Sequence, residues 1–252
     1  MYKKCTGFYK GTEKIMNKRI SVVIPTYNEE RYVERCLKSL VNQTLPRTEF
    51  ELIVVDGGSA DKTVELAQEY ADIVMQQKSK GVGGARNDGV DVASAELIAT
   101  TDADIILPED WLARICANLA RDGVVVAYGP IKPIEEKFKY RFFIGMFNQL
   151  MHVFEILKVF YFTIGSNTAF RRRAFLQVGG YSDMPAGDDY GIALKLKRKG
   201  RIFYDPYLYV WFSMRRMEKF GIMRALYIWI LNVVSAKRGK RPKVNYMQQT
   251  YK

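Results

Sequence analysis

Two aspartates one residue apart, Asp102 and Asp104, directly follow an apolar run that is typical of a buried β-strand. Alternate residues of an extended chain point to the same side, so both carboxylates can face one ligand. Carboxylate oxygens suit Mg²⁺ or Mn²⁺, with a diphosphate and water completing the coordination shell. A pair of solvated turn aspartates is the simpler explanation of this spacing. The position at a strand end favours a metal site.

Polar residues follow two other predicted strands in the same way. Asn28, Glu29 and Glu30 come soon after the first strand, and the stretch Asp56–Ser59 comes directly after the second. Open parallel sheets bind their ligands beyond the carboxyl ends of the strands. We therefore expect the three strand ends to meet at one edge of the sheet and to form one binding site.

A glycine-rich segment, Gly81–Asn87, resembles a dinucleotide-binding turn only in part. The third glycine of a GxGxxG pattern would fall at Arg86, and the segment follows the third predicted strand, which disfavours a Rossmann dehydrogenase. The turn after the first strand contains no glycine, which excludes a P-loop. We interpret the segment as a loop that approaches a ligand closely, with Arg86 reaching a phosphate; ordinary loop glycines are the alternative.

The elements that must position these residues alternate between strand and helix. This alternation predicts an α/β fold with a largely parallel sheet flanked by helices. The predicted strands are Ile20–Ile24, Phe50–Val55, Ile73–Met75, Leu97–Thr101 and Val124–Tyr128. Apolar helix faces are predicted at Val33, Leu37, Leu40 and Val41, at Val64, Ala67 and Ala71, and at Leu112, Ile115, Cys116 and Leu119.

Composition narrows the classes of protein. A chain of 252 residues with 48% hydrophobic residues can bury one substantial core, and its net charge of +12 calls for an anionic partner such as nucleotide phosphates, nucleic acid or an acidic membrane. Three scattered cysteines and a single histidine exclude a Cys/His zinc site and favour a reducing compartment. The first residues lack the apolar core of a signal peptide, so we expect a cytoplasmic protein.

Two apolar stretches lie in the second half of the chain. Phe142–Phe154 is 13 residues long without a charge, and Ala225–Ala236 is 12. Both are shorter than the roughly 20 residues that a membrane-spanning helix needs. We expect that the segments Phe142–Phe162 and Ile222–Val234, with the basic run Lys237–Lys243, hold the protein peripherally on the cytoplasmic face of an anionic membrane. Two helices packed under the sheet are the alternative.

Several ordered motifs resemble the family 2 glycosyltransferases of the GT-A fold. They are Ser21–Glu30, Asp56–Ser59, Ala85–Asn87, Asp102–Asp104, Gly165–Asn167, Gly179–Asp183, Gly187–Asp189 and Lys195–Gly200. The resemblance covers roughly residues 18–220. It implies a nucleotide-sugar half at 18–130 and a C-terminal acceptor half at 131–220. From composition, we expect a weakly ordered basic lead-in at 1–17 and an apolar helix with a basic tail at 221–252.

The resemblance implies an inverting, hexosyltransferase-like enzyme that uses a nucleoside-diphosphate sugar and Mg²⁺ or Mn²⁺. Asp104 would hold the metal against the diphosphate, and Asp102 would contact the ribose or the metal. Arg215 and Arg216 would close over the phosphates, although a solvated basic pair is an equally simple reading. The residues expected in the base and ribose pocket are Pro25, Tyr27, Glu29, Asp56, which would accept a hydrogen bond from the base, and Arg86.

The family places an acidic pair, usually Glu-Asp, at its general base. Here the matching pair is Asp188 and Asp189, and Asp189 is the better candidate. Both should lie at a helix N-terminus, where the helix dipole favours an ionised carboxylate; a plain helix cap is the alternative. The lone His152 lies in the aromatic segment and is left out of the site. The Gln-x-x-Arg-Trp motif of processive synthases is absent, which indicates one sugar per encounter.

Three other functions compete with transfer to a hydroxyl acceptor, which is a sugar or a lipid-linked group. A polyprenyl-phosphate acceptor is already anionic and needs no base. A sugar-nucleotide pyrophosphorylase would carry a glycine-rich basic loop where this chain has Thr26–Asn28. A non-catalytic protein that binds nucleic acid has only the net charge in its favour, because no recognition motif accompanies it, so no nucleic-acid partner is expected.

Overall fold

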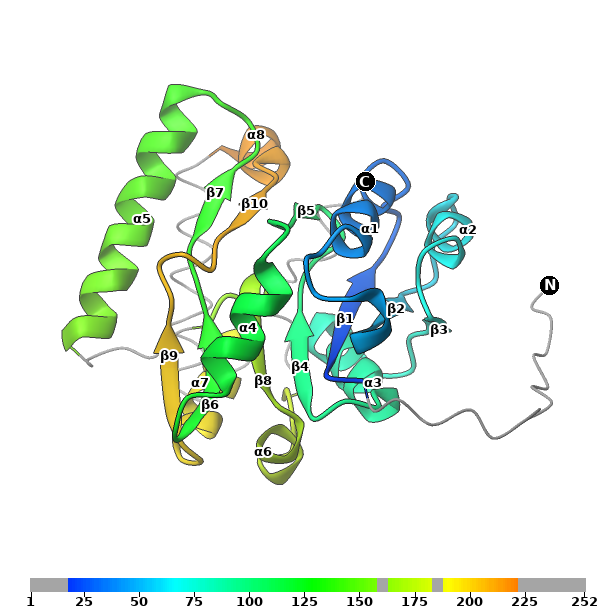
Figure 1. Cartoon of the computed structure of the whole chain (residues 1–252). Coiled ribbons are helices and arrows are strands. Elements are labelled where there is room, and N and C mark those ends of the chain that lie inside the picture. Colours follow the sequence, from blue (N-terminus) through cyan, green and yellow to red (C-terminus); the bar gives the residue numbers. More distant parts are fainter. Residues whose placement is uncertain (1–17, 158–162, 183–187, 222–252) are drawn as a thin grey trace.

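The computed structural model describes residues 18–157, 163–182 and 188–221. Its centre is a seven-stranded sheet in the order β3-β2-β1-β4-β8-β6-β9 (Figure 1). The first four of these are parallel, β8 runs antiparallel between β4 and β6, and β9 is parallel to β6. The strands are β1 (Ile20–Thr26), β2 (Phe50–Asp56), β3 (Ile73–Gln76), β4 (Leu97–Thr100), β6 (Val124–Tyr128), β8 (Thr168–Arg171) and β9 (Arg201–Tyr204).

The α/β prediction is confirmed, and each of the five predicted strands is present with ends within two residues of those predicted. The helices are α1 (Val33–Val41), α2 (Thr63–Gln68), α3 (Gly81–Val92), α4 (Trp111–Leu119), α5 (Phe138–Leu157), α6 (Arg172–Gln177), α7 (Asp188–Lys197) and α8 (Arg215–Phe220), with 3₁₀ turns η1 (Arg47–Glu49) and η2 (Gly165–Asn167). Ala71 of the second predicted helix face lies beyond the end of α2.

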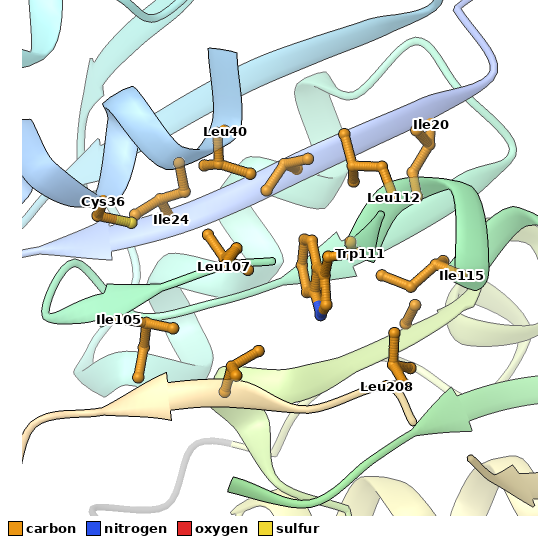
Figure 2. Close-up of a cluster of buried hydrophobic side chains, with 14 of the residues drawn as sticks. Ile20, Ile24, Cys36, Leu40, Ile105, Leu107, Trp111, Leu112, Ile115 and Leu208 are labelled. Atoms are coloured by element: carbon orange, nitrogen blue, oxygen red, sulfur yellow. The ribbon is translucent and has the colours of Figure 1, made fainter. Parts of the chain in front are cut away.

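Alternate side chains of the strands feed two separate cores, one on each face of the sheet. Val22 and Val54 belong to the core that α1 and α4 cover, whereas Val23 and Val55 belong to the core under α3, α6 and α7. Figure 2 shows the first core, in which Trp111 lies among apolar side chains of α4, β1 and the turn before α4. Burial on both faces explains why these strands are apolar at nearly every position.

A second, three-stranded sheet connects the turn after β4 with the strand that precedes α8. It consists of β5 (Ile105–Ile106), β10 (Val210–Phe212) and β7 (Ile131–Pro133), in the order β5-β10-β7. β5 follows the Asp102–Asp104 turn directly and pairs antiparallel with β10, which precedes α8. This pairing brings the end of β4 and the start of α8 together although they are about a hundred residues apart in sequence.

We expected the glycine-rich segment Gly81–Asn87 to be a loop, but it forms the first half of α3. Two of the glycines of α3 are needed for close packing. A Cβ at Gly84 would lie 2.8 Å from Cβ of Ser79, and one at Gly89 would lie 2.3 Å from Cγ1 of Val23 in β1. Glycine lowers helix propensity, but here it lets the helix approach the sheet, and tertiary packing decides the outcome.

The apolar part of the second half forms the 20-residue helix α5, which stands at one side of the molecule (Figure 1). Across the described ranges, we find no helix that combines the length and the apolar character required to cross a bilayer. Residues 158–162 of the expected membrane segment, the stretch Ile222–Val234 and the basic run Lys237–Lys243 lie outside the described residues. Cys36 and Cys116 are buried free thiols.

Candidate active site

The loops that follow β1 and β2 are fastened by Asp56. Its carboxylate is buried and accepts hydrogen bonds from Thr26 Oγ1 (3.2 Å), from the backbone N–H of Gly58 (3.0 Å) and from the N–H of Ser59 (2.9 Å). Thr26 is the in-register neighbour of Asp56 across the two parallel strands. The buried carboxylate therefore shapes the turn at which the second strand ends.

The two loops are also joined to each other. Asn28 has a positive φ of 52°, its N–H donates to Ser59 Oγ (2.8 Å), and its Oδ1 accepts from the N–H of Ala60 (2.9 Å). The N–H of Glu29 donates to Thr63 Oγ1 (2.7 Å) at the start of α2. Two of the three strand ends predicted to share an edge are therefore joined by hydrogen bonds, and Tyr27 lies exposed beside them.

Arg86 links two acidic groups from distant parts of the chain. From α3, its guanidinium donates to Asp102 Oδ1 (2.9 Å) after β4 and to Asp189 Oδ1 (3.2 Å) in the first turn of α7. The arginine side chain is 4% exposed, and its guanidinium lies 5.6 Å from the ring centre of Tyr181. We expected Arg86 to project from a loop; instead it projects from a helix and links Asp102 to the candidate base, Asp189.

Gly165 makes room for this arrangement. A Cβ at this position would lie 2.4 Å from Asp189 Oδ1 and 2.5 Å from Arg86 Nη1. A larger residue at position 165 would push the guanidinium and the carboxylate apart. Sequence reasoning noted Gly165 only as part of a motif, and the motif itself is the signal that could have identified it.

Arg215 links a second pair of carboxylates. Its Nε donates to Asp104 Oδ2 (2.9 Å), its Nη2 donates to Glu29 Oε1, and its guanidinium lies 4.4 Å from the ring centre of Tyr32. Both carboxylates are almost fully buried. Sequence reasoning missed Tyr32, because nothing local indicates a contact with an arginine far along the chain.

Asp102 and Asp104 lie in the turn between β4 and β5, so the alternation expected of an extended strand does not apply to them. Each carboxylate instead meets its own arginine. The backbone oxygen of Asp102 accepts a hydrogen bond from Cys36 Sγ (3.5 Å). Burial, followed by the nearby charges of Asp104 and Asp102, raises the pKa of the Cys36 thiol, so this sulfur stays protonated and is a poor metal ligand.

The donor chemistry of the turn fits Mg²⁺ or Mn²⁺. Nowhere among the described residues do three or more histidine, cysteine or acidic side chains gather as a ready-made metal site. Magnesium sites commonly use one or two carboxylates together with substrate phosphates, and Asp102 and Asp104 supply that number. Arg215 already places one positive charge against Asp104, so a metal ion bound there would compete with this ion pair.

The remaining predicted residues are placed as follows. Pro25 lies in β1, Asp188 and Asp189 begin α7, and Arg216 follows Arg215 at the start of α8. The side chains of Asp188 and Arg216 are not among those described, and neither are residues 183–187. His152 lies in α5 with its ring centre 5.5 Å from that of Tyr204.

The model of the family described as Glycosyl transferase family 2 matches residues 21–179, which is more than half of the chain. The chain belongs to this family. The family match runs from β1 through α6 and so includes Asp102, Asp104 and Arg86. The part of the chain that carries Asp189 and Arg215 lies beyond it.

Curated members of the family share only part of their length with this chain. Glycosyltransferase AglE of Haloferax volcanii is 32% identical over 119 residues, which are 45% of this chain and 39% of that protein. The mannosyltransferase PcManGT of Pyrobaculum calidifontis, solved with GDP-mannose and Mn²⁺, superposes with a TM-score of 0.69 at 23% identity and covers 90% of this chain and 67% of that one.

The structure of Staphylococcus aureus TarS with UDP-GlcNAc superposes with a TM-score of 0.63 at 22% identity, covering 77% of this chain and 58% of TarS. At such identities these two structures establish that the family 2 chain has the GT-A fold of the neighbours and no more than the fold. The matched stretch spans less than half of AglE.

Proposed function

We propose that this family 2 glycosyltransferase transfers one sugar from a nucleoside-diphosphate sugar to a hydroxyl acceptor, with inversion at the anomeric carbon and with Mg²⁺ or Mn²⁺. One observation carries the proposal. Arg86 binds both Asp102, in the acidic turn after β4, and Asp189, at the start of α7. The candidate base therefore lies close to the candidate donor site, since both contact the same guanidinium.

Asp189 would act as the general base. Its carboxylate would take the proton of the acceptor hydroxyl while that oxygen attacks the anomeric carbon from the side opposite the diphosphate. The bond from carbon to the acceptor oxygen forms as the bond to the diphosphate breaks, so no covalent sugar intermediate arises. Arg86 and the room left by Gly165 would fix the direction of the carboxylate.

The donor would lie across the unit formed by the loops after β1 and β2. Tyr27 and Pro25 offer an apolar wall for the base, and Asp56 and Glu29 hold the loops in shape. Asp104 and Asp102 would hold the cation, which when bound neutralises charge on the departing diphosphate. Arg215, and Arg216 beside it in sequence, would add positive charge to the same phosphates.

A polyprenyl phosphate is the alternative to a hydroxyl acceptor. A polyprenyl phosphate carries an anionic oxygen and would not need Asp189. The apolar exposed face of α5 supports a lipid-linked acceptor and a peripheral position on a membrane, and either kind of lipid acceptor would suit it. Removal of the carboxylate of Asp189 should slow transfer to a hydroxyl acceptor but not transfer to a polyprenyl phosphate.

The test uses purified full-length protein with a panel of UDP- and GDP-sugars, Mn²⁺ or Mg²⁺, and hydroxyl and polyprenyl-phosphate acceptors. Asp189→Asn keeps the shape of the side chain but cannot take a proton. We expect it to lower the rate of transfer about 100-fold or more and to change donor affinity by only a few-fold. Product release and the anomeric configuration are measured by NMR.

Asp122→Asn, in an exposed turn, is the matched control and should transfer at the normal rate. Release of no nucleoside diphosphate with any donor would contradict the proposed function. Transfer to a polyprenyl phosphate that survives in Asp189→Asn would favour the rival acceptor, and a product with retained configuration would exclude the inverting mechanism.

A further inference from the structure

The side of α5 that faces away from the fold is almost wholly apolar. Large side chains recur along it every three or four residues and are exposed: Phe138, Phe142, Met146, Leu150, Val153 and Ile156. A spacing of three to four places them in one stripe along the helix. The exposed residues of α5 include no carboxylate, and the charged ones are Lys139 and Arg141. A surface helix of a monomeric protein normally presents a polar face here.

The opposite side of α5 fixes the helix to the protein. Tyr140, Phe143 and Met151 are buried, and the side-chain amide of Asn148 binds both backbone groups of Ile131 in β7. Phe143, which we expected on the membrane-binding surface, therefore belongs to the core. The stripe cannot turn inward without breaking these contacts, so it is a stable feature of the surface.

The excess positive charge of the chain lies in the sequence at its two ends. Residues 19–218 contain 26 Lys and Arg and 26 Asp and Glu, whereas residues 219–252 contain eight Lys and Arg and no Asp or Glu. The remaining excess lies in residues 1–18. Glu218 of α8 binds Lys137 (2.6 Å) just before α5, so α8 meets the N-terminal end of the stripe.

We propose that the exposed stripe of α5 docks on an anionic lipid surface, with the helix lying parallel to the membrane and with Lys139 and Arg141 drawn to the lipid headgroups. An apolar face flanked by lysine and arginine is the combination that binds at such an interface. The role of this docking in catalysis rests on the proposed function. α8 adjoins α5 and contains Arg215, which binds Asp104, so docking would hold the donor site near a lipid-linked acceptor.

The experiment is co-sedimentation of the full-length protein with vesicles of phosphatidylglycerol and phosphatidylcholine, and with vesicles of phosphatidylcholine alone. Wild type should bind the anionic vesicles and lose affinity as salt rises. Phe142→Glu and Leu150→Glu should each weaken binding about tenfold or more, because a charge replaces a side chain buried in lipid. Leu176→Glu on α6 is the control, since Leu176 is 44% exposed and Leu150 is 48% exposed.

Sedimentation with neither kind of vesicle, or an equal loss in Leu176→Glu, would overturn the proposal. A lipid-free dimer that Phe142→Glu separates would show that a second copy covers the stripe. Vesicle binding that appears only when the chain is truncated after Gly221 would show that the segment 222–252 covers it instead. Release of nucleoside diphosphate, measured without lipid, reports on the proposed reaction separately and should be equal in wild type and Phe142→Glu.

Discussion

At the scale of single residues, the candidate site depends on two arginines that each bridge two carboxylates. Arg86 holds Asp102 and Asp189, and Arg215 holds Asp104 and Glu29. Asp104 and Glu29 are nearly buried, and such carboxylates are costly unless they are paired, so Arg215 stabilises the fold as well as shapes the site. Arg215 occupies one side of the carboxylate to which we assign the metal, so the guanidinium and a cation compete for Asp104.

This competition makes Arg215→Met informative. Methionine keeps the length of the side chain but removes the charge that faces Asp104 and Glu29. We expect Mn²⁺ alone to bind the variant about tenfold more tightly than wild type. Without metal, the free energy of unfolding should fall by about 1–3 kcal/mol, because two buried carboxylates lose their partner. Calorimetry and urea unfolding measure the two effects.

Arg114→Met is the matched control, because Arg114 also bridges two carboxylates, Asp110 and Asp205. It should leave the affinity for Mn²⁺ unchanged. If Arg215→Met bound Mn²⁺ no better than wild type, Asp104 would not be the carboxylate at which cation and arginine compete.

At the scale of elements, α3 shows how a helix is held in place to carry a functional side chain. Gly89 allows close contact with β1, and Asp88 fastens the segment that leads into α3. Asp88 accepts hydrogen bonds from the N–H of Lys78 (2.6 Å), the N–H of Ser79 (2.9 Å) and Ser79 Oγ (2.6 Å). Arg86 lies half a turn earlier in the same helix, so the packing of α3 on β1 and the hydrogen bonds of Asp88 together fix its position.

The ionisation of Asp88 should therefore appear in the stability of the protein. Burial acts to raise the pKa of Asp88, but the hydrogen bonds from Ser79 and Lys78 outweigh it and lower this pKa below the ordinary value. A lowered pKa in the folded state gives stability that is complete above the unfolded value, about 3.9, and is lost as the pH falls through the folded value.

We expect Asp88→Asn to lower the free energy of unfolding by about 1 kcal/mol at pH 7, with a difference from wild type that shrinks below about pH 4. Asp91→Asn, an exposed position of the same helix, should differ little from wild type at either pH. Urea unfolding between pH 3 and pH 7 measures this dependence. A constant difference across that range would mean that the charge of Asp88 contributes nothing.

At the scale of the whole molecule, Asn167 joins the two sheets to the core. It is fully buried; its Nδ2 donates to the backbone oxygens of Pro130 (3.0 Å) and Leu208 (2.6 Å), and its Oδ1 accepts from Trp111 Nε1 (2.9 Å). One amide thus connects α4, η2 and the segments that lead into β7 and β10. The placement of α8 beside the acidic turn depends on this connection.

Replacement of Asn167 by leucine should destabilise the whole fold. Three buried polar groups lose a hydrogen bond at once, so we expect the free energy of unfolding of Asn167→Leu to fall by about 3 kcal/mol or more. The midpoint in urea should fall while the slope of the transition stays the same. Asn42→Leu, at an exposed position after α1, should unfold close to wild type.

The sequence by itself determined the α/β class, five strands and the acidic residues at the strand ends. These features are local: apolar β-branched runs mark buried strands, and helix periodicity marks α1 and α4. The ordered motifs were enough to indicate family 2, which the family match then established for residues 21–179. The assigned roles of Asp104 and Asp189 remain predictions, because nothing yet measures them.

Tertiary structure alone decided where the two arginines go and which side of α5 is exposed. Arg86 and Asp189 are 103 residues apart and Arg215 and Asp104 are 111 apart, so no local pattern relates them. They meet because η2, just before β8, adjoins the end of β4, and because β10 pairs with β5. Likewise, tertiary packing decided that Gly81–Asn87 is helical, since α3 packs closely against β1. Such contacts are set by the packing of the whole chain, which sequence periodicity does not encode.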